Sequence, residues 1–214
     1  MAIKPILFNT EMVRAILGGR KSCTRRLVKF LSGENPRWTG YIKDGLMLYN
    51  GKNEPCIRKA PYQPGDILYV RETWERFECW NCEGDERGNC PKQPQKSVLD
   101  KTCGCYMYLA TDEIYGDARW HPSIHMPKEA ARIWLKVTDV RAERLQDITS
   151  EQICREGTEV EGPFVLNGEE KRSAFSALWN STIKKSDLDR YGWDASPWVW
   201  VIEFERCEKP EGEN

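Results

Sequence analysis

The stretch TEMVRAILGGRKSCTRRLVKF, residues 10–30, carries the most informative local pattern in the chain. Thr10 is a typical N-cap residue, and apolar residues recur behind it at helical spacing, so the pattern predicts a helix over residues 11–17. Gly18 and Gly19 end this helix, because glycine readily adopts the left-handed backbone found just after helix C-termini. The residues that follow therefore begin as a turn at the end of a helix.

This turn opens a run of basic residues. The segment from 19 to 29 contains no acid and includes Arg20, Lys21, Arg25, Arg26 and Lys29. Composition alone favours a solvated basic strand on the surface. The other interpretation is a reactive site, because crowding by like charges would lower the pKa of Lys21 and let it act as a base near neutral pH. Thr24, three residues further on, would then be a usable nucleophile for acyl transfer.

The composition sets broad limits. The 214 residues include 32 Lys plus Arg and 33 Asp plus Glu, a formal net charge of -1, which argues against bulk electrostatic binding of nucleic acid but permits a local basic site. The sequence contains no run of about 18 apolar residues, so it predicts no membrane span. The N-terminal residues lack the features of a secretory signal, so we expect a cytoplasmic protein. The length fits one elaborated domain, or one domain with a small insert.

Outside the basic run, strand patterns alternate with a few short helices. A helix is predicted from Thr149 to Arg155, ended by Gly157, and another begins at Ser173. An Asp-Gly pair between residues 41–43 and 46–49 indicates a hairpin. Further strands are predicted at residues 5–8, 66–74, 106–110, 131–145 and 197–206. The pattern favours an α+β fold built on a small, curved or barrel-like sheet. No glycine-rich phosphate loop is present, which disfavours a nucleoside triphosphate enzyme.

The helix followed by GxKxxxxR, with Gly19, Lys21 and Arg26, resembles the ASCH domain of the PUA-like superfamily, whose usual pattern is GxKxxExR. Thr24 stands where the commoner pattern has Glu. Three further blocks are similar to the second strand, short helix and last strand of that family: residues 65–70, 145–157 and 200–204. The resemblance implies an ASCH-type β-barrel with short flanking helices. The overall pattern also resembles ASCH-type proteins carried by phages and prophages.

The Thr24 variant is similar to the bacterial acetylcytidine amidohydrolases. That resemblance implies Lys21 as proton acceptor, Thr24 as nucleophile and Glu156 as proton donor. ASCH and PUA-like folds host RNA binding, nucleoside hydrolysis and nuclease activity, so the fold alone does not decide the function. The implied partners are a nucleoside, RNA or a modified DNA base.

Residues 75–105 form a predicted Cys-rich insert in a single domain made of residues 1–74 and 106–207, with a disordered tail over 208–214. Four thiolates bind Zn²⁺ tetrahedrally, and CxxC is a usual half-site. The predicted structural zinc ligands are Cys79, Cys82, Cys90 and one of Cys103 or Cys105. The alternatives are a disordered loop with reactive thiols and a disulfide formed in vitro.

Several other side chains are candidates for the site. Glu72 is a rival carboxylate, which we interpret as a salt-bridged strand residue. Cys23 lies among cations that would favour its thiolate, so it is a possible competing nucleophile. The predicted ligand-binding set is Gly19, Arg20, Arg25, Arg26, Trp38, Trp120 and His125, the two tryptophans as stacking surfaces and the histidine at the pocket rim.

Three functions stay open at this point. The chain is an enzyme that hydrolyses an amide on a modified base or nucleoside, a non-catalytic reader of RNA or of a modified DNA base, or a phage accessory protein that binds a host protein through the insert. The first requires the side chains of Lys21 and Thr24 to meet, whereas the second requires only an accessible basic surface.

Overall fold

Strands dominate the part of the chain that the structure describes. The computed structural model describes residues 1–30, 41–43, 47–49, 60–78, 95–96, 103–112, 119–158 and 167–211. It divides into two units, which are described separately. The first unit is Met1–Lys4, Ala15–Leu68 and Leu135–Glu208, and the second is Pro5–Arg14, Tyr69–Trp134 and Lys209–Asn214.

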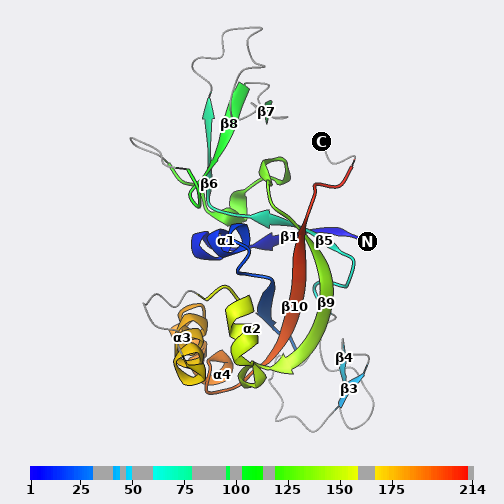
Figure 1. Cartoon of the computed structure of the whole chain (residues 1–214), viewed down its shortest axis with the longest axis vertical. Helices are drawn as coiled ribbons and strands as arrows, with labels where there is room; N and C mark the ends of the chain where they lie inside the picture. Colours follow the sequence, from blue (N-terminus) through cyan, green and yellow to red (C-terminus); the bar gives the residue numbers. More distant parts are fainter. Residues whose placement is uncertain are drawn as a thin grey trace. The chain divides into compact units, whose positions relative to one another are not determined.

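The main sheet has five strands in the order β1-β5-β9-β10-β2 (Figure 1). Their bounds are β1 Ile3–Leu7, β2 Cys23–Leu27, β5 Ile67–Arg71, β9 Trp134–Arg144 and β10 Trp198–Cys207. The mixed α+β class is confirmed. The expected barrel is wrong for the described strands, because β1 and β2 stand at the two ends of this order and the sheet is not closed. Closure would need a ladder between these two strands.

Strand β10 positions the basic run. It pairs antiparallel with β2, with Val201 opposite Arg25 and Ile202 opposite Thr24. Its sequence WVWVIEFERC is rich in β-branched and aromatic residues, which suits a strand that is buried on both faces. Because side chains alternate along a strand, successive residues of the basic run point to opposite faces of the sheet.

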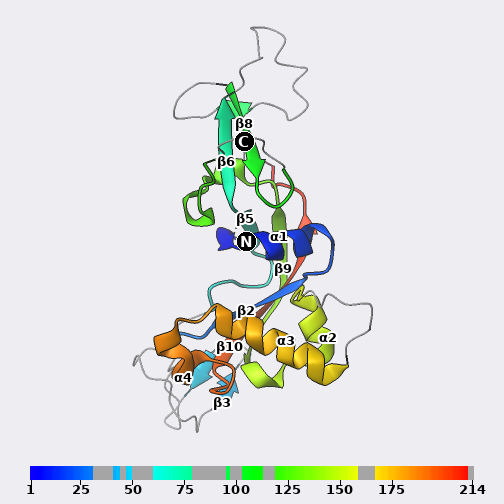
Figure 2. The ribbon, with the colours of Figure 1, turned by 90° about the vertical axis from the view of Figure 1, so that its left-hand side faces the viewer.

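One face of β2 and β10 is covered by helices α2 Ser150–Arg155 and α3 Gly168–Ser181 (Figure 2). Short helix α4, Leu188–Tyr191, follows α3. The core between these elements contains Leu145, Ile148, Ile153, Phe175, Trp179, Val199 and Val201. Burying a side chain of this size contributes about 1.5–3 kcal/mol. These contacts hold α2 against β10, which is the partner of the strand that carries the basic run.

The caps of these helices partly correct the sequence analysis. Thr149 and Gln152 form the N-terminal capping box of α2, which agrees with the predicted start. Helix α3 begins earlier than predicted, because Asn167 and Glu170 form a capping box whose N-cap lies six residues before Ser173. Helix α1, Thr10–Leu17, starts one residue earlier than predicted, so Thr10 is its first helical residue rather than its N-cap, and the side chain of Asn9 accepts the backbone N–H of Met12.

The second unit contains a smaller sheet in the order β6-β8-β7. Its strands are β6 Trp74–Glu78, β7 Gln95–Lys96 and β8 Cys103–Tyr108. Strands β6 and β8 pair antiparallel, so both ends of the predicted insert are strands. The predicted hairpin is confirmed in the first unit, where β3 Tyr41–Lys43 pairs with β4 Met47–Tyr49. None of the described helices is long and apolar enough to cross a membrane.

Gly157 ends α2 with a left-handed backbone, φ +74°, and it lies against the basic run. A Cβ at this position would be 2.7 Å from Ala15 Cβ and 2.8 Å from Lys21 Cβ. Gly19 has a similar φ of +71°, but a Cβ there would meet nothing within 4 Å. Both positions therefore favour glycine because of their left-handed backbone, and only at Gly157 would a side chain also collide with neighbouring atoms.

We predict that Gly157→Ala lowers the free energy of unfolding much more than Gly19→Ala. Both variants lose about 1–2 kcal/mol because the left-handed conformation is unfavourable for alanine. Only Gly157→Ala adds about 1–3 kcal/mol of overpacking against Ala15 and Lys21. Urea unfolding of both variants measures the difference. Equal losses would contradict the close approach of Gly157 to the basic run.

Candidate functional site

Lys21 is buried and paired with an acid from α2. The two residues Lys21 and Glu156 form an isolated antiparallel bridge. Lys21 Nζ donates hydrogen bonds to the Glu156 backbone oxygen at 2.8 Å and to Glu156 Oε2 at 2.9 Å. The Lys21 side chain is only 1% exposed. Its surroundings therefore include an opposite charge, rather than only the crowd of cations that the sequence predicts.

Arg25 binds the other oxygen of the same carboxylate. Its Nη1 donates to Glu156 Oε1 at 2.9 Å, and its Nη2 donates to Gln152 Oε1 at 3.0 Å. Gln152 Oε1 also accepts the backbone N–H of Thr149, so the capping box of α2 orients the guanidinium as well. We call Lys21, Arg25 and Glu156 the buried ion cluster. Each of the three is at most 5% exposed.

The ion pairs continue along the same side of the sheet. Arg141 Nη1 donates to Glu203 Oε1 at 2.7 Å, and Arg155 Nη2 donates to Glu203 Oε2 at 2.6 Å. Burial raises the pKa of Glu203, but the hydrogen bonds from these two arginines outweigh it and hold the pKa below its usual value. The Glu143 carboxylate links the two groups, since it accepts from Arg141 Nε at 2.5 Å and lies 3.6 Å from Arg25 Nη2.

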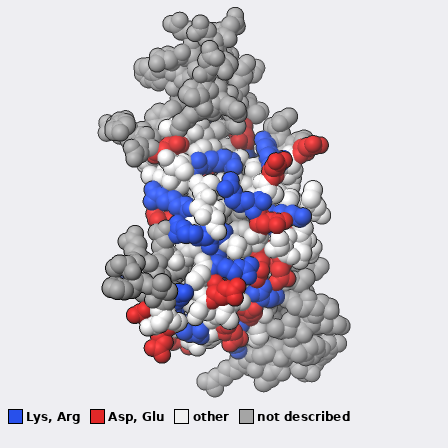
Figure 3. Space-filling model, viewed as in Figure 1, with Lys and Arg blue, Asp and Glu red and all other residues white. Residues whose placement is uncertain are grey.

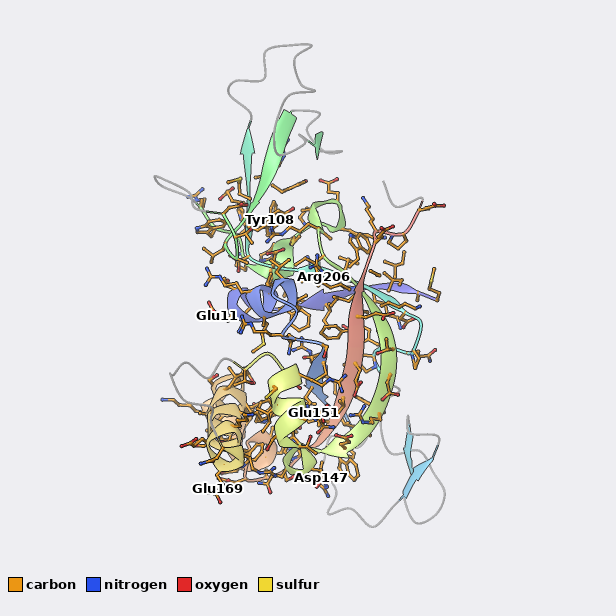
Figure 4. All side chains as sticks on the ribbon, viewed as in Figure 1. Glu11, Tyr108, Asp147, Glu151, Glu169 and Arg206 are labelled. Carbon is orange, nitrogen blue, oxygen red and sulfur yellow. The ribbon has the colours of Figure 1, made fainter. Side chains whose placement is uncertain are left out.

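Charges in this network balance. The cations are Lys21, Arg25, Arg141 and Arg155, and the carboxylates are those of Asp139, Glu143, Glu156 and Glu203. On the face shown in Figure 3, basic and acidic side chains are likewise interspersed. In Figure 4, side chains of α2, where Glu151 is labelled, extend toward β10. The helix-covered side of β2 is therefore a neutralised ionic layer rather than a basic surface.

Thr24 and Arg26 point to the other face of β2. Arg25 contacts α2, and alternation places its two neighbours on the opposite side, where they face Ile202 and Trp200 of β10. Thr24 is 4% exposed, whereas the Arg26 side chain is exposed. The structure thus brings Lys21 and Glu156 together, and it places Thr24 on the other side of the strand from both.

Exposure separates the cations of the basic run into two groups. Lys21 and Arg25 are buried in the ion cluster, while Arg20, Arg26 and Lys29 have exposed side chains. Burial nevertheless lowers the pKa of the Arg26 guanidinium. The guanidinium is therefore partly desolvated, and its contacts with a ligand would be less screened than those of a fully solvated cation.

Tyr62 lies near enough to Arg26 for their charges to interact, and the sequence analysis missed it. The positive charge of Arg26 acts on the Tyr62 hydroxyl, although burial is the larger effect and raises its pKa. Lys4 Nζ lies 5.9 Å from the centre of the Tyr62 ring. One sequence signal could have indicated Tyr62. In PYQPGD, residues 61–66, its aromatic side chain stands in a short segment bounded by prolines.

Cys23 does not provide a reactive thiolate, which corrects the competing-nucleophile interpretation. It is 1% exposed on the helix-covered side of β2. Burial, followed by the negative charge of Glu156, raises the pKa of its thiol to about 12, and the neighbouring cations do not compensate. The thiol is therefore protonated at neutral pH.

In the second unit, Glu72 is confirmed as a salt-bridged residue. Its two oxygens accept from Arg132 Nε and Nη2, both at 2.9 Å, and Glu72 is 1% exposed. The Arg132 guanidinium also covers the Tyr108 ring at 3.9 Å. His125 is exposed at the end of a short 3₁₀ turn, and Trp120 is half-buried. Neither belongs to the unit that contains the basic run.

Several predicted ligands lie outside the described residues. Trp38 is one, and so are Cys79, Cys82 and Cys90. Cys103 and Cys105 lie on β8, and only the backbone of these two residues is described. The zinc site therefore stays a prediction. Among the described residues, no group of His, Cys, Asp and Glu is arranged to hold a metal ion.

A cavity of about 360 Å³ lies in the first unit and does not involve the basic run. Its lining residues come from α3, α4 and the segment that follows: Asn180, Leu188, Asp189, Gly192, Trp193, Asp194 and Ala195. The charged groups in this lining are two carboxylates, which would repel a phosphate. This cavity does not suit the ligand that the basic run predicts.

No family model and no curated protein matches this chain. Among solved structures, it is similar to the high-resolution crystal structure of an ASCH domain from Lactobacillus crispatus JV V101. The two are 13% identical, the match covers 96% of this chain and 79% of that chain, and the TM-score is 0.36.

We predict that Glu156→Gln destabilises the protein more than Lys21→Met. Removing the carboxylate leaves two buried cations without it, at a cost of about 3–5 kcal/mol, whereas Arg25 still neutralises Glu156 when Lys21 is replaced. Urea unfolding measures both losses. Glu151→Gln, at an exposed position on the same helix, is the control and should stay within about 0.5 kcal/mol of the wild type. A larger loss for Lys21→Met would mean that the carboxylate does not organise the cluster.

Proposed function

We propose that this chain binds nucleic acid through the exposed cations of the basic run. The supporting observation is the division of that run by burial. Glu156 neutralises Lys21 and Arg25 inside the protein, while Arg20, Arg26 and Lys29 have exposed side chains. Exposed Lys and Arg side chains contact phosphate oxygens and supply most of the sequence-independent affinity of nucleic-acid-binding proteins.

The chain's charge supports a local site rather than a general one. A net charge of -1 gives no long-range attraction to a polyanion, so affinity has to come from a short segment of one sign. The run from residue 19 to 29 is such a segment. The resemblance of its GxKxxxxR pattern to the ASCH domain, a fold family that includes RNA-binding proteins, points in the same direction.

We predict that removing the three exposed cations weakens both the binding and its salt dependence. The variant is Arg20→Gln, Arg26→Gln and Lys29→Gln, measured by fluorescence anisotropy with a labelled single-stranded oligonucleotide over a salt series. Each lost phosphate contact reduces the slope of log K against log salt by about 0.7, so the full variant should lose about 2.

A matched variant controls for net charge. Lys184→Gln, Lys185→Gln and Arg190→Gln removes the same charge from exposed positions around α4 in the same unit. It should leave the slope nearly unchanged. Equal losses in the two variants would mean that binding is non-specific electrostatics, and no binding by the wild type would overturn the proposal.

A second candidate is the amide hydrolase that the resemblance to acetylcytidine amidohydrolases implies. One observation favours it: the implied base Lys21 and the implied donor Glu156 are in direct contact at 2.9 Å. This chemistry needs the proton of the ion pair on Glu156, which leaves Lys21 as a neutral amine. The Thr24 hydroxyl then adds to the acyl carbonyl as Lys21 takes its proton, Glu156 protonates the amine as the C–N bond breaks, and water hydrolyses the resulting ester to restore Thr24. Because Thr24 lies on the other face of β2, Lys21 would have to leave Glu156 to reach it.

We predict for this candidate that the wild type releases free acid from N-acylated nucleosides, as followed by chromatography. Thr24→Ala should abolish release and Thr24→Ser should retain it, since only the serine variant keeps a hydroxyl. Lys21→Ala should lower the rate about 10²–10⁴-fold. Full activity in Thr24→Ala, or no release by the wild type, would exclude the hydrolase and leave the binding function.

A further inference from the structure

Tyr62 and Arg26 come from distant parts of the sequence and lie near enough for their charges to interact. Strand β2 carries Arg26, and Tyr62 precedes β5. The Arg26 charge acts on the Tyr62 hydroxyl, and Lys4 from β1 lies 5.9 Å from the ring centre. All three residues belong to the first unit. A half-buried aromatic ring therefore lies beside Lys4, whose charge Asp66 balances, and near the exposed Arg26.

The segment that carries Tyr62 is held rigidly. Lys4 Nζ donates to the Pro61 oxygen at 3.1 Å and to Asp66 Oδ2 at 2.7 Å. Asp66 Oδ2 also accepts the Gln63 backbone N–H at 3.1 Å, and Asp66 Oδ1 accepts the Ala2 N–H at 2.9 Å. These bonds tie both sides of Tyr62 to the start of β1. A pre-positioned ring loses little conformational entropy on binding a ligand.

The position of Gly65 strengthens this anchoring. Its φ of +87° allows the turn between Pro64 and Asp66, and its N–H donates to the Val137 oxygen at 2.8 Å in β9. The loop is therefore attached to the main sheet on one side and to Lys4 on the other. Tyr62 itself is half-buried, so the ring is supported by the protein and still reaches the surface.

We propose that Tyr62 is the base-stacking residue of the nucleic-acid site, so that the ligand is a single strand with unpaired bases. This inference rests on the proposed binding function. Proteins that bind single strands combine cations along the phosphate backbone with aromatic rings on which bases stack. Arg26 beside Tyr62 provides both groups at one place. A duplex could use the cation but not the ring, because its base faces are already stacked on each other.

The test compares two oligomers of equal charge by fluorescence anisotropy: a 12-nucleotide oligouridylate, and an abasic phosphodiester chain of the same length. The wild type should bind oligouridylate more tightly. Tyr62→Ala should weaken oligouridylate binding about 5- to 150-fold and leave abasic binding within about twofold, since only the base contact is lost. Tyr62→Phe, which keeps the ring, should retain the affinity.

Two further variants keep the result interpretable. Tyr62→Leu preserves apolar bulk without an aromatic face, and it should behave like Tyr62→Ala even if the alanine variant folds poorly. Tyr191→Ala is the matched control, because Tyr191 is also half-buried beside an arginine, with Arg190 at 5.0 Å from its ring. It should bind both oligomers like the wild type.

The outcomes separate this inference from the proposed function. If the wild type binds both oligomers and Tyr62→Leu weakens both equally or neither, nucleic-acid binding stands and the stacking role is wrong. If a 12-base-pair duplex binds as tightly as oligouridylate and with the same sensitivity to Tyr62→Leu, single-strand selectivity is wrong. If the wild type binds none of these oligomers, the proposed function and the inference both fail.

Discussion

The Glu156 carboxylate is the group on which the arrangement of the basic run depends. One oxygen accepts from Lys21 and the other from Arg25, all within the protein interior. Burying these charges separately would be very unfavourable, and pairing them in good geometry offsets much of that cost. The pairing attaches the run to the end of α2, and Gly157 is required there because a side chain would collide with Lys21.

This pairing also divides the run into two functional parts. Residues that face α2 belong to a neutral ionic layer, which continues through Glu143 and Glu203. The side chains of Arg20, Arg26 and Lys29 are exposed, and Arg26 interacts electrostatically with Tyr62. The same alternation that exposes Arg26 moves Thr24 away from Lys21. The geometry therefore supports binding more directly than hydrolysis, which needs those two side chains in contact.

Local patterns predicted much of the fold. The start of α2 and the strands that carry β-branched and aromatic residues agree with the structure, because capping and alternation act over a few residues. The predicted N-cap at Ser173 was wrong, since Asn167 and Glu170 form a capping box that starts α3 earlier. Glu156 was indicated only through the family resemblance, and Tyr62 was missed, because their partners are distant in the sequence.

By itself the sequence determined that a helix precedes a short basic run without acids, and that this run enters a sheet of an α+β protein. Those features depend on neighbouring residues, whose propensities and charges can be read directly. Only the tertiary structure decided that the sheet formed by the described strands is open, that Lys21 faces a carboxylate, and that Thr24 faces away from it. Strand order and register join distant segments, and a shift of register by one residue would exchange the two faces of β2.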